Sequence, residues 1–121
     1  MSTGNRVKPG RLEKAHSLSR GWDDFMRGEL ADAERAQTYL EVAIDEFRES
    51  GDGDDFLEAL RYLAKANGGI AEVARKTGFN RESLYRTLSR HGNPRFRTVL
   101  GVIDALGMRV KIERASNLRP S

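Results

Sequence analysis

The chain has 121 residues and a mass of 13.6 kDa, a size that accommodates one domain with a short extension but not two full domains. It contains no cysteine, which excludes disulfide scaffolds, thiolate metal sites and cysteine nucleophiles. Its apolar runs are too short for a membrane span or a signal peptide, so we expect a soluble, cytoplasmic protein.

The net charge of +3 conceals three segments of different charge. Residues 1–28 carry six basic and three acidic residues, residues 29–60 carry two and eleven, and residues 61–121 carry thirteen and four. The basic C-terminal half favours a polyanion-binding surface. The acidic segment favours a positively charged partner or, as the simpler alternative, a solvated helix face.

Residues 1–28 are predicted to be a basic N-terminal arm or extension, because glycines and a proline interrupt any periodicity. A short helix can start near Trp22 and Phe25. These two aromatic residues are candidates for binding a partner, although such pairs also cover the core of small domains. The cations of the arm could enter a DNA minor groove, or the arm could be a tail with incidental charge.

Two helices are predicted between Glu29 and Gly68. Apolar residues recur at steps of three and four from Glu29 until Gly51, which ends the first helix. Asp54 or Asp55 is expected to cap the second helix, and Gly68-Gly69 stops it.

The end of the first helix carries an unusual concentration of carboxylates. Negative charge there opposes the helix dipole, so local stability does not explain it. A cationic protein partner would explain it, and the expected partner-binding residues are Asp45, Glu46 and Glu49, with Trp22 and Phe25 as further candidates.

Three further helices are predicted in the C-terminal half. The third helix covers Ile70 to Thr77, and the fourth runs from the cap Asn80 to about Arg90. Asn93-Pro94 is expected to start the fifth helix, with Asn as the cap and Pro at the first helical position. This fifth helix is expected to end at Gly107 and to bury its apolar residues, which are Phe96, Val99, Leu100, Ile103 and Leu106.

A change of period follows the fifth helix. Met108, Val110 and Ile112 alternate with charged residues up to Glu113, which predicts a short β-strand. A single strand needs a partner, either in its own chain or in a second copy, so these three residues are expected to form a two-fold dimer contact. Residues 114–121 are expected to be a tail.

The stretch from Ile70 to Arg90 has the spacing of a helix-turn-helix. Ala74 is small where two helices would cross, Gly78 permits a left-handed turn, and Leu84 is an apolar residue that pins the second helix. The outward-facing residues of that helix are expected to read DNA bases: Arg81, Glu82, Tyr85, Arg86 and Ser89. The flanking residues are expected to contact phosphates: Arg75, Lys76, Asn80, Arg90, Arg95 and Arg97. An ordinary helical hairpin with a polar outer face is the alternative.

The stretch from Ala59 to Ile112 resembles the probable addiction-module antidote family, HigA-like antitoxins with a lambda-repressor-like helix-turn-helix. The most specific matches are RESLYRTLS (Arg81 to Ser89), GNPRF (Gly92 to Phe96) and VIDALGMRV (Val102 to Val110). YLEVAIDEFRESGD (Tyr39 to Asp52) resembles the family's leading helix, so the likeness covers about residues 30–113.

The resemblance and the predicted elements together imply an all-α, five-helix domain over residues 29–113 with a short C-terminal strand. The resemblance further implies a sequence-specific repressor that binds double-stranded operator DNA, autoregulates its operon and neutralises a small basic RelE-like toxin.

Other chemistry has little support in the sequence. Asp52, Asp54 and Asp55 do not form a calcium loop, because Leu57 and Leu63 occupy the positions that require glycine and glutamate. The two histidines are far apart and have no clustered ligands, so we expect no metal, no cofactor and no enzymatic activity. Two other functions remain open: a stand-alone phage or mobile-element regulator without a toxin, and a toxin-neutralising module with vestigial DNA binding.

Overall fold

The computed structural model describes residues 20–117, and this part of the chain is all-helical, without a strand. Six α-helices and one short 3₁₀ turn follow one another: α2 (Arg20–Leu30), α3 (Ala33–Ser50), α4 (Gly53–Ala66), α5 (Ile70–Thr77), α6 (Arg81–Thr87), α7 (Phe96–Ala105) and η2 (Ala115–Asn117). The expected all-α class is confirmed, but the expected count of five helices is wrong because α2 is a separate helix. None of the described helices is long and apolar enough to cross a membrane.

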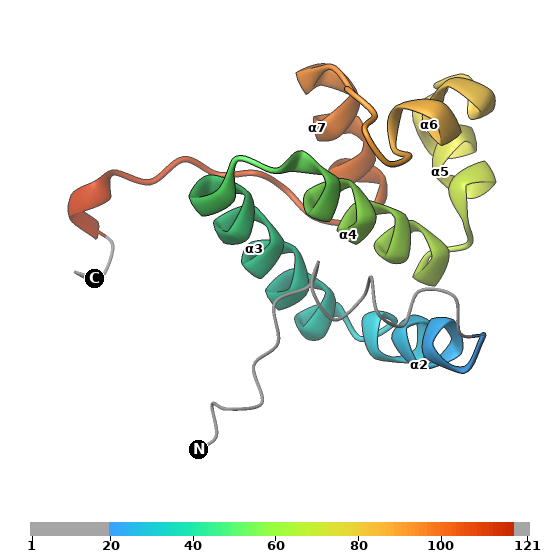
Figure 1. Cartoon of the computed structure of the whole chain (residues 1–121), viewed down its shortest axis with the longest axis horizontal. Helices are drawn as coiled ribbons and strands as arrows, with labels where there is room; N and C mark the ends of the chain where they lie inside the picture. Colours follow the sequence, from blue (N-terminus) through green and yellow to red (C-terminus); the bar gives the residue numbers. More distant parts are fainter. Residues whose placement is uncertain (1–19, 118–121) are drawn as a thin grey trace.

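Helix α4 lies at the centre of the fold. It packs against α2 and α3 on one side and against α5 on the other, and α5 in turn contacts α6 and α7 (Figure 1). Leu60 and Leu63 of α4 are fully buried. The core is therefore continuous from the α2–α3 layer to the α5–α7 layer.

The boundary between α2 and α3 lies a few residues after the predicted helix start at Glu29. Leu30 ends α2, and Asp32 caps α3 by accepting a hydrogen bond from the Arg35 backbone N–H at 3.0 Å. Gly51 ends α3 as predicted: it has a left-handed φ of 73°, and its N–H donates to the Phe47 carbonyl at 2.8 Å. The expected boundary between extension and domain, after residue 28, falls inside α2, and residues 1–19 lie outside the described part.

Helix α4 begins earlier than predicted. Its N-cap is Asp52, whose carboxylate accepts the Asp54 backbone N–H at 3.0 Å, so neither Asp54 nor Asp55 is the cap. The physical reason is that Gly53 already has helical geometry, which places the two later aspartates in the first turn. At the other end the Gly69 N–H reaches back to the Ala64 carbonyl at 2.7 Å, and this closes α4 near the predicted glycines.

Helix α7 begins at Phe96 and not at Pro94, with Arg95 as an N-cap that makes no side-chain hydrogen bond. The expected burial of Phe96 is wrong, because 73% of this residue is exposed. It stands at the first residue of α7, outside the buried stripe of Val102, Ile103 and Leu106. Gly107 ends α7 as predicted, with a φ of 86°.

The predicted strand is absent. Residues 108–114 are irregular, and Ile112 is 92% exposed. A strand requires a neighbour that completes its backbone hydrogen bonds, and the described part of this chain offers none. The dimer contact through Met108, Val110 and Ile112 stays a prediction, because it concerns a second copy of the chain. The expected tail is described only as far as Asn117.

Candidate functional site

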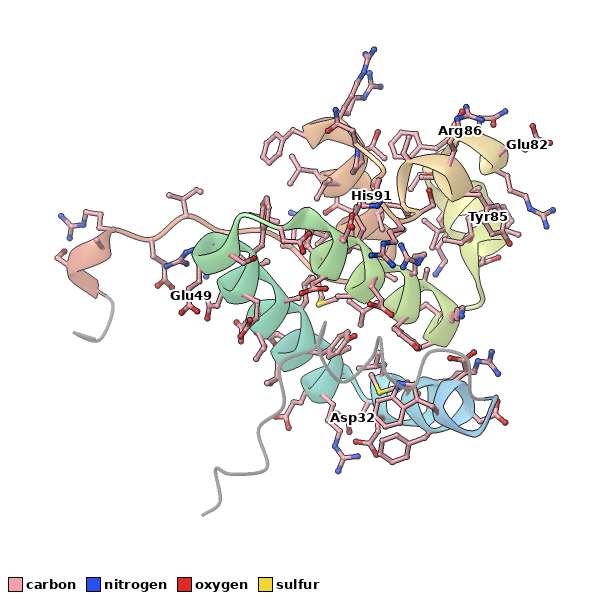
Figure 2. The ribbon with its side chains drawn as sticks, in the orientation of Figure 1. Asp32, Glu49, Glu82, Tyr85, Arg86 and His91 are labelled. Carbon is pink, nitrogen blue, oxygen red and sulfur yellow. The ribbon has the colours of Figure 1, made fainter. Side chains whose placement is uncertain are left out.

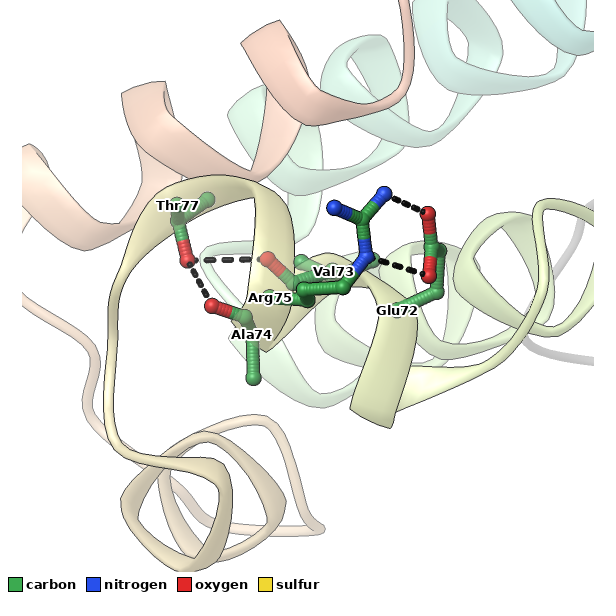
Figure 3. Close-up of polar contacts among 5 residues, drawn as sticks. All are labelled: Glu72, Val73, Ala74, Arg75 and Thr77. Atoms are coloured by element: carbon green, nitrogen blue, oxygen red, sulfur yellow. Dashed lines mark hydrogen bonds and ion pairs between the residues drawn. The ribbon is translucent and has the colours of Figure 1, made fainter.

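A sharp turn joins α5 to α6. Gly78 adopts a left-handed φ of 80°, and its N–H donates to the Ala74 carbonyl at 2.8 Å. The Thr77 hydroxyl donates to the Val73 carbonyl at 2.9 Å (Figure 3) and accepts the Phe79 backbone N–H at 3.1 Å. Backbone and side-chain hydrogen bonds thus define the angle at which the chain leaves α5.

Helix α6 is held at its start by a cap and along its inner face by leucines. The Asn80 side-chain oxygen accepts the Ser83 backbone N–H at 2.9 Å. Leu84 is 1% exposed, and Leu88 just beyond the helix is fully buried. Ala74 of α5 is also buried, so the predicted inner face is confirmed. The predicted helix Ile70–Thr77 is confirmed as well, because α5 has these bounds. The predicted end near Arg90 is wrong, because α6 ends at Thr87.

The packing role of Gly101 was not predicted from the sequence. A Cβ atom at Gly101 of α7 would lie 2.7 Å from the Phe79 ring, so this glycine makes room for the aromatic residue of the turn. A lone glycine inside an otherwise apolar helix is the signal that could have indicated a close approach.

The five predicted base-reading residues are all exposed on α6 or directly after it: Arg81, Glu82, Tyr85, Arg86 and Ser89. Figure 2 shows Glu82 and Arg86 directed away from the body of the protein. Tyr85 is 53% exposed, and the Arg81 guanidinium lies 5.9 Å from its ring centre. Ser89 lies just after α6, and its hydroxyl already donates to the Arg86 carbonyl in the last turn of α6 at 2.6 Å.

The predicted phosphate contacts have different surroundings. Lys76, Arg95 and Arg97 are exposed. Asn80 is occupied as the α6 cap, and Arg90 lies 3.7 Å from the Asp54 carboxylate.

Arg75 forms an ion pair with Glu72 within α5. Its guanidinium donates two hydrogen bonds to Glu72, at 2.5 and 3.0 Å (Figure 3). These contacts lower the pKa of the Glu72 carboxyl group and raise the pKa of Arg75. Arg75 is therefore partly neutralised before any phosphate approaches.

The predicted partner-binding residues lie on two helices. Asp45 and Glu49 are exposed near the end of α3, Glu46 is half-buried, and the Asp45 carboxylate lies 3.3 Å from Arg48. On α2, Trp22 packs against the core, whereas its neighbour Phe25 is more than half exposed. Trp22 therefore contributes to the core, whereas the exposed Phe25 remains a candidate for binding a partner.

Metal-ligand geometry does not occur among the described residues, since no group of three or more His, Asp or Glu side chains could hold an ion. The aspartates that suggested a calcium loop serve instead as the α4 cap, through Asp52, and as a contact to the turn after α6, through Asp54.

Comparison with known proteins identifies the family. Residues 24–114 match the family described as probable addiction module antidote protein. An uncharacterised protein from Haemophilus influenzae is 34% identical over 86 residues, which cover 71% of this chain and 84% of that protein. No solved structure matches the chain significantly. The chain therefore belongs to the probable addiction module antidote family, and this membership indicates the antitoxin of a toxin–antitoxin module.

Proposed function

We propose that this antitoxin is also a transcriptional repressor, which binds its operator DNA as a homodimer and neutralises a small, basic, RelE-like toxin. One observation carries the DNA-binding part: α6 has the buried Leu84 on one side and an exposed face with Arg81, Tyr85 and Arg86 on the other. The turn with Gly78, the cap Asn80 and the buried residues Ala74 and Leu84 support a helix-turn-helix.

The chemistry of this face suits the edges of base pairs in a major groove. An arginine can donate two hydrogen bonds to a guanine, and Glu82 can accept from a cytosine amino group. Lys76 at the end of α5 and Arg95 and Arg97 at the start of α7 are exposed and can contact phosphates. In a two-fold dimer, two copies of α6 would reach half-sites about 34–36 Å apart.

Replacement of Arg86 by alanine is expected to reduce operator-binding free energy by about 1–3 kcal/mol and to relax the base preference at one position. The measurement is a titration of the promoter DNA by gel shift, together with unrelated DNA of equal length. Arg48→Ala is the matched control, because Arg48 is an exposed arginine on α3, outside the proposed DNA surface.

Equal effects of Arg86→Ala on promoter and unrelated DNA would show that Arg86 contacts phosphate and does not read sequence. If the wild-type protein has no preference for its promoter, the chain is instead a toxin-neutralising module. A promoter-binding protein that captures no toxin would be a stand-alone regulator.

The acidic end of α3 is the proposed toxin-binding surface. Asp45 and Glu49 are exposed there, where their charge opposes the helix dipole. A toxin that cleaves RNA needs a cationic surface, and an acidic cover would both attract that surface and block it.

The triple variant Asp45→Asn, Glu46→Gln, Glu49→Gln is expected to slow association with the toxin about tenfold at low salt and to weaken its salt dependence. Stopped-flow mixing at several salt concentrations measures both quantities. The control neutralises three exposed carboxylates outside this surface, Asp24, Glu34 and Asp104, and both variants should still bind promoter DNA. If the triple variant associates with the toxin at the wild-type rate, the acidic end of α3 is a solvated helix face, and Phe25 becomes the next candidate for toxin binding.

A further inference from the structure

The turn that follows α6 has a demanding backbone geometry. His91 has a φ of 66°, the only left-handed value among the non-glycine residues that the structure describes. Such a conformation is unfavourable for a residue with a Cβ atom and persists only when its surroundings impose it. The next residue, Gly92, donates its N–H to the Ser89 carbonyl at 2.8 Å, which folds the turn back toward α6.

Asp54, in the first turn of α4, contacts His91 and Arg90 in the turn after α6. Its Oδ1 accepts the His91 backbone N–H at 2.7 Å, and its Oδ2 lies 3.1 Å from His91 Nδ1. The same Oδ2 lies 3.7 Å from Arg90 Nε. The side chain of Asp54 is only 14% exposed, whereas those of Arg90 and His91 are 67% and 76% exposed. The carboxylate is therefore fixed within the fold and meets the turn at the surface, where its charge strengthens the hydrogen bond to the His91 N–H.

A second side chain of α4 acts on the same end of α6. Arg61, two turns further along α4, donates a hydrogen bond to the Leu88 carbonyl. Figure 2 shows His91 between α4 and the end of α6. The main packing partner of α6 is α5, and the polar contacts from α4 add to the burial of Leu88 in holding the C-terminal end of α6.

We propose that Asp54 is a positioning residue of the DNA-binding surface. It stabilises the left-handed conformation of His91 and thereby sets the end of α6 and the direction of Arg90, one of the expected phosphate contacts. The expected effect on DNA binding rests on the repressor function proposed above. The expected effect on the conformation of the turn does not depend on that function.

Replacement of Asp54 by alanine is expected to lower promoter affinity about tenfold, because the turn loses a charge-assisted hydrogen bond and its left-handed residue relaxes. Asp54→Asn keeps an oxygen that can accept a hydrogen bond from the His91 N–H, so this variant should lose less promoter affinity. The decisive variant adds His91→Gly to Asp54→Ala: glycine adopts a left-handed φ without a steric cost, so promoter affinity should recover most of the loss.

Asn93→Gly in the Asp54→Ala background is the matched control, because Asn93 is an exposed neighbour with a negative φ. This substitution should restore no promoter affinity. The proposal is overturned if Asp54→Ala binds the promoter like the wild type, or if His91→Gly restores no more than Asn93→Gly.

Hydrogen exchange of the backbone amides provides a readout that does not depend on DNA. The His91 and Gly92 amides should lose protection in Asp54→Ala, and the Gly92 amide should regain it when His91→Gly is added. If the wild-type protein shows no promoter preference, the repressor function fails and this measurement decides the proposal alone. Unchanged protection in Asp54→Ala would then refute it.

Discussion

Replacing Leu84 with alanine is expected to reduce the free energy of unfolding by about 2–5 kcal/mol. Leu84 is among the largest fully buried side chains, and it joins α6 to the core beneath the turn. A small domain has only about 5–15 kcal/mol of stability, so the variant should lose a large fraction of it. Urea titration followed by circular dichroism measures the loss.

The neighbouring variant Tyr85→Ala separates packing from recognition. Tyr85 is exposed on the proposed reading face, so its loss should leave stability within about 0.5 kcal/mol of the wild type while promoter affinity falls. If both variants unfold at the same urea concentration as the wild type, Leu84 does not anchor α6.

Substitution of Gly92 with alanine is expected to reduce the free energy of unfolding by a similar amount, about 3 kcal/mol or more. The added Cβ would lie 2.0 Å from the Thr87 carbonyl oxygen and 2.9 Å from that of Ser89. Both obstacles are backbone atoms at the end of α6, so a side-chain rotation cannot relieve the clash. The turn must open, and we expect loss of promoter binding together with a lower melting temperature.

Gly28→Ala is the matched control for this substitution. Gly28 lies in α2 with no atom within 4 Å of the position of its Cβ, and it has no left-handed φ. Alanine there should be neutral or stabilise the helix by up to about 1 kcal/mol. A Gly92→Ala variant as stable as Gly28→Ala would show that the turn after α6 can rearrange freely.

The acidic segment combines structural and exposed carboxylates. Asp52 caps α4 and Asp54 holds the turn after α6, so their negative charge has roles inside the fold. Asp45 and Glu49 have no comparable role, although Asp45 pairs with Arg48 at the surface. The proposal of a cationic partner therefore depends on the end of α3 and not on the whole acidic run.

The sequence by itself determined the elements that depend on neighbouring residues. Helix α5 has the predicted bounds because Gly78 supplies a left-handed turn and Asn80 caps the next helix, and both effects act within four residues. The burial of Leu84 also followed from its spacing after Ala74 and Gly78. The DNA-reading and partner-binding roles of the exposed residues remain predictions, because spacing indicates which way a side chain faces but not what it binds.

Only the tertiary structure decided the features that depend on residues far apart in sequence. Asp54 meets His91, a residue 37 positions away, and Gly101 accommodates the ring of Phe79. Phe96 is exposed although its helix is apolar, since burial depends on which neighbour covers each turn. The alternation after Gly107 forms no strand, because a strand is stabilised by hydrogen bonds to another strand and the described chain places none beside it.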